Sequence, residues 1–275
     1  MAHQTFNDPW GSGECESEHV SHNYVERSNW QLCHRIDWNG LIGVHGERHA
    51  ERFHPNAWRQ LGRVARDLDD LGRRFHPSGR SYPLTWLGDV GVKVCKPGWH
   101  RFGLAVDLSR ISWGSQYVDF NAHWRPSVAS HLRLRYLAAV AVFRCHFGVV
   151  LHAYNDPDGS HANHVHLDRS RHAVALARDY LSDQSIIHLT ANWLLGRNLR
   201  VAEGWGDDTE AAYQDLLECF GMASRSDSDV ELDPLTRADH FRMLLRLIAR
   251  TAFHNAEPGV FIVPSTPNAE SPDES

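Results

Sequence analysis

The stretch His161-Ala-Asn-His164-Val-His166-Leu-Asp168 lies near the middle of the 275-residue chain and directs the interpretation of the rest. Its second half alternates polar and apolar residues, which predicts a β-strand. In such a strand His164, His166 and Asp168 point to one face, and the two apolar residues between them point to the other. Two imidazoles and a carboxylate on one face suit metal binding or proton transfer, although the solvated face of an edge strand has the same composition.

An earlier stretch, His100-Arg-Phe-Gly103-Leu-Ala105-Val-Asp107, supplies further possible ligands. Fully extended, the seven residue steps from His100 to Asp107 span about 23 Å. Two ligands of one zinc ion have donor atoms within about 4 Å of each other, so the backbone must fold back to form a site. Gly103 permits such a turn, and Ala105 keeps the neighbouring side chain small. The alternative is a turn into a buried strand, with His100 and Asp107 as surface groups.

The composition is that of a globular protein and limits the choice of partner. Hydrophobic residues make up 42% and charged residues 23% of the chain, and the formal net charge is −6. This balance gives no electrostatic reason to expect nucleic acid or an anionic membrane. The 20 histidines and 10 tryptophans permit metal chemistry and aromatic ligand contacts. The five cysteines are scattered without a Cys-x-x-Cys pair, which fits a reducing compartment.

The N-terminal residues lack both a basic and an apolar segment, so we expect no signal peptide. No apolar run approaches the roughly 20 residues that a transmembrane helix needs. We therefore expect a chain that is cytoplasmic as synthesised and that reaches any substrate outside the cell by a non-classical route.

Hydrophobic periodicity predicts the order of the elements. Residues 1–50 are polar and rich in glycine and are interpreted as an N-terminal extension, whereas residues 256–275 are predicted to be a disordered tail. The expected helices are 56–75, 128–147, a short helix at 171–181, 186–195, 208–220 and 237–253. The expected strands are 84–87, 90–95 and the two strands of a hairpin over 149–169.

These elements predict an α+β fold with a small antiparallel sheet flanked by helices and followed by a helical C-terminal region. A length of 275 residues favours two domains. We expect a first domain at 51–182, which contains both histidine stretches, and a helical domain at 183–255.

Together the two stretches resemble the metal-binding motifs of the D-Ala-D-Ala metallopeptidase group. The closest likeness is to the extensin-like C-terminal domain, whose H-x-x-G-x-A-x-D and H-x-H-x-D motifs correspond to residues 100–107 and 164–168. The resemblance covers residues 55–172 and implies a zinc fold of the Hedgehog and DD-peptidase type.

The resemblance implies a role for individual residues. His100, Asp107 and His166 would bind Zn²⁺ and leave one coordination position open, as in catalytic zinc sites. His164 would orient or deprotonate the attacking water, and Asp168 could accept a hydrogen bond from a ligand imidazole. Two further candidates for contacts around the ligands are His161 and His152. No residue can be assigned to substrate binding.

The chain departs from the family pattern at two positions. Gly98 stands where the family has a serine two residues before the first ligand. Asn163 stands where the carboxypeptidase branch has a glutamate three residues before the last ligand. A glutamate base is therefore excluded at that position, and catalysis would depend on His164.

The resemblance implies a zinc-dependent hydrolase that cleaves peptide bonds of peptidoglycan, in stem or cross-link peptides that contain D-amino acids. The partner would be peptidoglycan or a peptide, without nucleic acid and without a membrane. A different class of protein stays open, namely a zinc-stabilised module that binds wall polymer or a partner protein without cleaving it. The motifs do not distinguish endopeptidase from carboxypeptidase action.

The C-terminal region carries a second likeness. The segment Glu203-Gly-Trp-Gly-Asp-Asp-Thr-Glu-Ala-Ala-Tyr213 resembles the D-G-x-x-G-x-x-T-x-x-A core of peptidoglycan-binding three-helix domains. Asp207 or Asp208 would cap the following helix, and Ala212 and Leu216 would pack inward. The family's Asp-Gly is Glu-Gly here and the glycines stand one residue closer together, so a plain helical bundle is the alternative.

Overall fold

The structure is a computed structural model of the chain. It describes residues 21–22, 31–34, 52–76, 78–92, 98–156, 158–170, 175–201, 203–223 and 232–256. Most of the predicted N-terminal extension and the predicted tail beyond residue 256 lie outside the described residues. No helix within the described ranges is long and apolar enough to cross a membrane.

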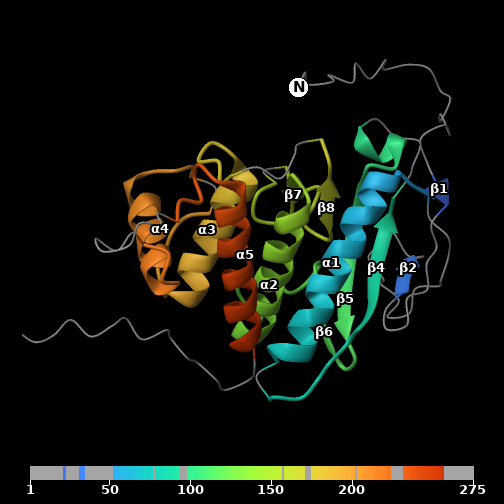
Figure 1. The fold of residues 1–275 in the computed structure, drawn as a ribbon, viewed down its shortest axis with the longest axis horizontal. Coiled ribbons are helices and arrows are strands. Elements are labelled where there is room, and N and C mark those ends of the chain that lie inside the picture. Colours follow the sequence, from blue (N-terminus) through green and yellow to red (C-terminus); the bar gives the residue numbers. More distant parts are fainter. Residues whose placement is uncertain are drawn as a thin grey trace, which may run out of the picture.

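The fold is α+β, as predicted, and its sheet is mostly antiparallel (Figure 1). The strands of this six-stranded sheet are β2 (Gln31–His34), β4 (Leu84–Gly91), β5 (Ala105–Trp113), β6 (Gln116–Asp119), β7 (Val149–Leu151) and β8 (Val165–Asp168). Their order is β2-β4-β5-β8-β7, and β6 also pairs with β5. β2 runs parallel to β4, whereas the other pairs are antiparallel. β1 (Ser21–His22) and β3 (Arg52–Phe53) form a separate two-stranded ladder.

The strand β4 corrects one prediction. Two strands separated by a turn at Gly88-Asp89 were expected, but β4 is one continuous strand. Its register against β5 shifts between Gly88 and Asp89 and again between Asp89 and Gly91. The turn-forming residues are thus accommodated as irregularities of the ladder, which bend a strand without ending it.

The short helix predicted at 171–181 is wrong for the described residues 175–180, because Leu176 N and Ala177 N donate to Pro234 O and Asp183 Oδ2 instead of to helical partners. The other five predicted helices are all present within the described residues, with ends that differ by a few positions. They are α1 (Pro55–Arg74), α2 (Ser130–His146), α3 (Leu181–Leu194), α4 (Asp207–Cys219) and α5 (Ala238–His254). α1 begins as its sequence dictates, since Pro55 occupies the first turn and His54 Nδ1 accepts a hydrogen bond from Asn56 N. In Figure 1, α1 lies alongside β4 and β5, and α4 lies at the opposite end of the molecule.

A single hydrophobic core connects the sheet with the C-terminal helices. α2 is buried along most of its length and packs against α1, α3 and α5. Arg144 of α2 and Asp183 of α3 form a fully buried ion pair with N–O distances of 2.6 and 3.1 Å. The hydrophobic core therefore includes residues on both sides of the predicted boundary between residues 182 and 183.

The start of α4 corrects the predicted cap. α4 begins at Asp207 itself, its N-cap is Gly206, and no side chain makes a capping hydrogen bond. Asp207 and Asp208 instead lie in the first turn, where negative charge interacts favourably with the helix dipole. Ala212 and Leu216 are buried, as predicted.

The core also determines which way the central strands present their polar residues. Val106 of β5 and Leu167 of β8 are fully buried in the hydrophobic core. Because side chains alternate along a strand, Asp107, His166 and Asp168 point to the opposite face of the sheet. Asp107 and His166 thus lie on strands whose opposite face is buried in the hydrophobic core.

Candidate metal centre

The pairing of β5 with β8 brings two predicted ligands together. Asp107 and His166 are direct cross-strand partners in the antiparallel register. Side chains at such positions lie on one face within about 5 Å of each other at Cβ. The strand predicted at residues 164–168 is therefore correct, and its partner is the strand that begins in the earlier motif.

The third ligand reaches the pair because the chain folds back at Gly103. His100 lies in the short 3₁₀ helix η1 (Trp99–Phe102), and Gly103 ends this helix with φ 64° and ψ 21°. This left-handed conformation favours glycine. Gly103 N donates a hydrogen bond to His100 O at 3.0 Å, and Leu104 N donates to Trp99 O at 3.1 Å. The fold-back predicted from the spacing of His100 and Asp107 is confirmed.

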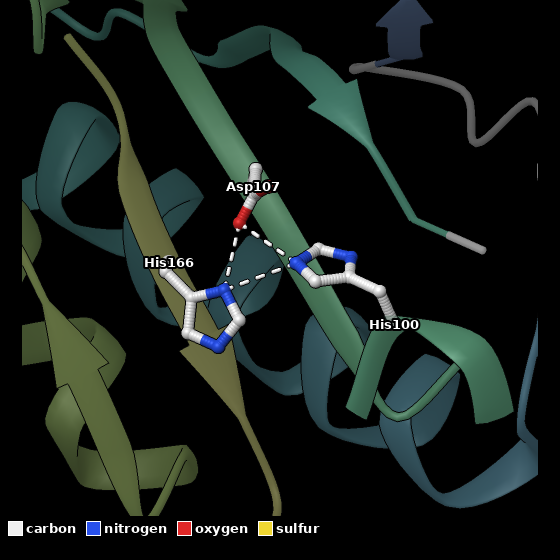
Figure 2. A group of neighbouring side chains, drawn as sticks. All are labelled: His100, Asp107 and His166. Atoms are coloured by element: carbon white, nitrogen blue, oxygen red, sulfur yellow. Dashed lines mark hydrogen bonds and ion pairs between the residues drawn. The ribbon is translucent and has the colours of Figure 1, made fainter. Parts of the chain in front are cut away.

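Three donor atoms converge in the space between η1, β5 and β8 (Figure 2). His100 Nε2 lies 3.1 Å from Asp107 Oδ1 and 3.1 Å from His166 Nδ1, and the last two atoms are 2.8 Å apart. Tetrahedral zinc with ligand bonds of about 2.0–2.1 Å separates its donors by about 3.3 Å. The geometry therefore needs only a small expansion to admit an ion.

The outer nitrogen of each imidazole has its own acceptor. His100 Nδ1 donates to the carbonyl oxygen of Val92 at 2.6 Å, and His166 Nε2 donates to Asp168 Oδ2 at 3.0 Å. Asp168 is held in turn by Ser170, whose main-chain N and Oγ donate to Asp168 Oδ1 at 2.8 and 2.5 Å. Such bonds fix the tautomer of a metal-binding histidine and leave the inner nitrogen free to coordinate. The donor set therefore fits a divalent metal ion such as zinc.

The buried carboxylate of Asp107 is stabilised by positive charge beside it. His100 and Asp107 are 3% and 2% exposed. Burial alone raises the pKa of Asp107, but its interactions with the His100 and His166 side chains hold this pKa well below its usual range. Burial lowers the pKa of His166, whereas its bonds to Asp107 and Asp168 raise it to about 9. A proton on His166 supplies the charge in the metal-free cluster, and an ion would replace that proton at Nδ1.

His164, the predicted catalytic residue, borders this cluster. Its Nε2 lies 3.7 Å from Asp107 Oδ1, and its side chain is largely buried. Its Nδ1 donates to Asn163 Oδ1 at 2.6 Å, which leaves Nε2 as the nitrogen with a lone pair. Asn163, at the position where the resemblance expects a glutamate, thus orients His164.

His161 lies beside the cluster, on the turn that precedes β8. Its ring centroid is 5.0 Å from that of His164 and 5.4 Å from that of His166. Asp156 Oδ2 accepts a hydrogen bond from His161 N at 2.6 Å and lies 3.1 Å from His161 Nδ1. His161 therefore contacts one predicted ligand and the predicted catalytic residue.

His152 was expected to contact the ligands, and the structure places it elsewhere. Its Nε2 bonds to Ser185 Oγ at 3.2 Å, and its Nδ1 accepts from Tyr154 N at 3.4 Å. His152 follows the last residue of β7, so the alternation of that strand does not govern its direction. It belongs to a buried network between the β7–β8 connection and α3, and burial lowers its pKa to about 3.

The depressed pKa of His152 predicts acid lability. An unfolded chain binds a proton at this histidine near pH 6.5, whereas the folded chain resists protonation down to about pH 3. The free energy of unfolding should therefore fall as the pH falls from 6.5 towards 3, and His152 should account for up to about 4 kcal/mol of this loss. Urea unfolding at pH 7 and pH 4 should show a smaller loss for His152→Gln than for the wild type. Equal losses would contradict the assignment.

Two residues of the centre were missed by the sequence analysis. The anchor of His100 is a main-chain carbonyl, that of Val92, and no side-chain pattern could indicate it. Asp156 lies in the turn segment Asn155-Asp-Pro-Asp-Gly159, where aspartate is expected for local reasons. Its position five residues before His161 was the available signal.

Comparison with known proteins adds nothing to this geometry. No protein-family model, curated protein or solved structure matches the chain. The resemblance of the two motifs therefore stays a prediction, and a function has to be inferred from the chemistry of the centre itself.

Proposed function

We propose that this chain is a zinc-dependent hydrolase that cleaves peptide bonds of peptidoglycan. The observation that carries the proposal is the convergence of His100 Nε2, Asp107 Oδ1 and His166 Nδ1 within 3.1 Å of one another. Both imidazoles are oriented from outside the centre, by Val92 and Asp168. Three protein ligands with a further position to fill are typical of catalytic zinc.

The residues around the three donors have separate roles in the proposed reaction. When bound, zinc supplies a Lewis acid that polarises a carbonyl and activates water near neutral pH. His164 Nε2 accepts the proton of the attacking water and returns it to the leaving amine. Asn163 keeps His164 in the tautomer that this role requires, because His164 Nδ1 carries the other proton. The His161 ring packs against the His164 ring, with centroids 5.0 Å apart.

The choice of peptidoglycan as substrate rests on the resemblance to the extensin-like and D-Ala-D-Ala metallopeptidase motifs. Those motifs favour peptide bonds next to D-amino acids in stem or cross-link peptides. Purified cell-wall material in an activity gel, with and without a chelator, tests this directly. Clearing that disappears with the chelator and returns with zinc supports the proposal, and undigested sacculi under all conditions contradict it.

His164→Ala tests the division of roles. We expect the variant to retain zinc at wild-type stoichiometry and to lose turnover by ~100-fold or more, because general base catalysis contributes about 10²–10⁴. Zinc content by elemental analysis and release of soluble muropeptides measure the two effects. His146→Ala is the matched control, since His146 pairs with Asp67 on the helical side of the molecule. Retained turnover in His164→Ala would remove the proposed base.

The distance between His164 and Asp107 also allows a second function. His164 Nε2 lies 3.7 Å from Asp107 Oδ1, close to the separation of about 3.3 Å between donors of one tetrahedral zinc. His164 is not among the donors that lie within 4.8 Å of one another, so it would have to move to become a fourth ligand. With that ligand the site would be closed and structural, and the chain would be a zinc-stabilised binding module. In that case His164→Ala would weaken zinc binding instead of sparing it, so the same variant separates the two functions.

A further inference from the structure

The turn that carries His161 and His164 depends on contacts outside regular secondary structure. It lies between the end of β7 and the start of β8. Neighbouring residues in the sequence hold it locally, since Asp156 Oδ2 accepts a hydrogen bond from His161 N and Ala162 N donates to Gly159 O at 3.2 Å. Such local bonds shape a turn but do not fix its position against the rest of the molecule.

A tryptophan from another part of the chain supplies that link. Trp124 lies between β6 and α2, and its indole Nε1 donates to the carbonyl oxygen of Ala162 at 2.8 Å. Ala162 stands directly between His161 and Asn163, and the Asn163 side chain orients His164. A shift of this carbonyl therefore moves the residues that border the metal centre.

Trp124 is itself held firmly. Its carbonyl oxygen accepts a hydrogen bond from Tyr154 Oη, and the two rings meet edge to face with centroids 5.9 Å apart. The Tyr154 ring meets Trp193 of α3 in the same way at 5.6 Å. Burial raises the pKa of Tyr154 to about 12, so its hydroxyl remains a donor at physiological pH. The link thus connects the turn to the helical core.

We infer that Trp124 is a positioning residue, which holds the turn carrying His161 and His164 against the metal centre through the carbonyl of Ala162. The effect on turnover rests on the proposed function, whereas the effect on the position of His164 does not. Loss of the indole N–H should let the turn move away from Asp107 while η1, β5 and β8 keep the three ligands in place.

Trp124→Phe removes the N–H and keeps an aromatic ring, and Tyr154→Phe removes the bond that fixes the Trp124 carbonyl. The position of His164 is measured by the rate at which diethylpyrocarbonate labels it, with peptide mass spectrometry. We expect labelling of His164 to rise ~10-fold in Trp124→Phe and less in Tyr154→Phe, because the turn opens more often. Zinc stoichiometry should remain at the wild-type value in both variants.

Turnover gives the second measurement. In Trp124→Phe, kcat should fall ~10- to 100-fold with little change in KM, because a misplaced base affects the chemical step more than binding. Trp205→Phe is the matched control, since its indole donates to Glu210 Oε2 at the start of α4. That variant should label and turn over like the wild type.

The outcomes separate the two proposals. If His164 labelling in both variants stays within about twofold of the wild type, the positioning role is wrong, whatever the turnover. If the wild-type protein leaves wall material intact but labelling rises in Trp124→Phe, the positioning role stands and the hydrolase proposal fails. If zinc is lost together with faster labelling, Trp124 supports the fold of the whole centre, and the specific role is wrong.

Discussion

Replacing His166 with alanine is expected to weaken zinc binding by at least ~100-fold, because three donors share a binding free energy of about 10 kcal/mol or more. His166 contributes Nδ1 to the donor cluster and is the cross-strand partner of Asp107. Its removal leaves two protein donors, His100 Nε2 and Asp107 Oδ1. Competition with a chromophoric chelator measures the affinity, and circular dichroism confirms that the fold is retained.

A graded series makes this result specific. Asp168→Asn keeps the ligand but weakens the acceptor of His166 Nε2–H, so we expect a smaller loss of about 10- to 100-fold in zinc affinity. His146→Ala, which alters a histidine paired with Asp67, should bind zinc as the wild type does. An affinity of His166→Ala equal to that of the wild type would exclude the proposed centre.

The second large effect is expected in the core. Asp183→Ala should lower the free energy of unfolding by about 3–5 kcal/mol, because it leaves the Arg144 guanidinium buried without its partner. Both side chains are inaccessible to solvent, and Asp183 also accepts a hydrogen bond from Ala177 N at 3.0 Å. Urea denaturation followed by tryptophan fluorescence provides the measurement.

A surface ion pair provides the comparison. Arg74 and Asp70 of α1 are bonded at 2.6 Å, but Arg74 is exposed and Asp70 is partly exposed, so Asp70→Ala should cost less than about 1 kcal/mol. If Asp183→Ala costs as little as Asp70→Ala, the buried pair does not stabilise the connection between α2 and α3. If Asp183→Ala unfolds in two transitions, the sheet and the C-terminal helices are separate units after all.

The cluster of His100, Asp107 and His166 was predictable because its determinants are local in sequence. The alternation at residues 164–168 set the strand face, and the spacing of His100, Gly103 and Asp107 required a fold-back. The ligand cluster then needed only the pairing of two strands. The structure adds that Asp107 and His166 are in direct register.

The packing of the helices was less predictable from the sequence. The helices of residues 183–255 look like a new domain because strands stop there, but a change of secondary structure does not reveal which surfaces meet. α2 is apolar around most of its circumference, and such a helix needs partners on several sides. That property was the sequence signal for a shared core, and α5 and α3 supply the partners.

The predictions for single residues that the structure corrects were wrong for similar reasons. His152 is of the same residue type as the ligands, but it lies one position beyond the end of β7 and turns into the core. Gly88 and Asp89 are typical turn residues, yet the residues before and after them pair with β5, and this pairing keeps β4 continuous. In both cases tertiary contacts outweigh local preference.

The orientations of the two candidate ligand histidines differ in their sensitivity to mutation of the residue that anchors each ring. The orientation of His100 is secured by a peptide oxygen, which every amino acid at position 92 would provide. The orientation of His166 is secured by one carboxylate, which a single nucleotide change can delete. In a random mutagenesis screen, loss-of-metal variants that spare the ligands themselves should therefore gather at Asp168 and its support Ser170, and not at the residue that anchors His100.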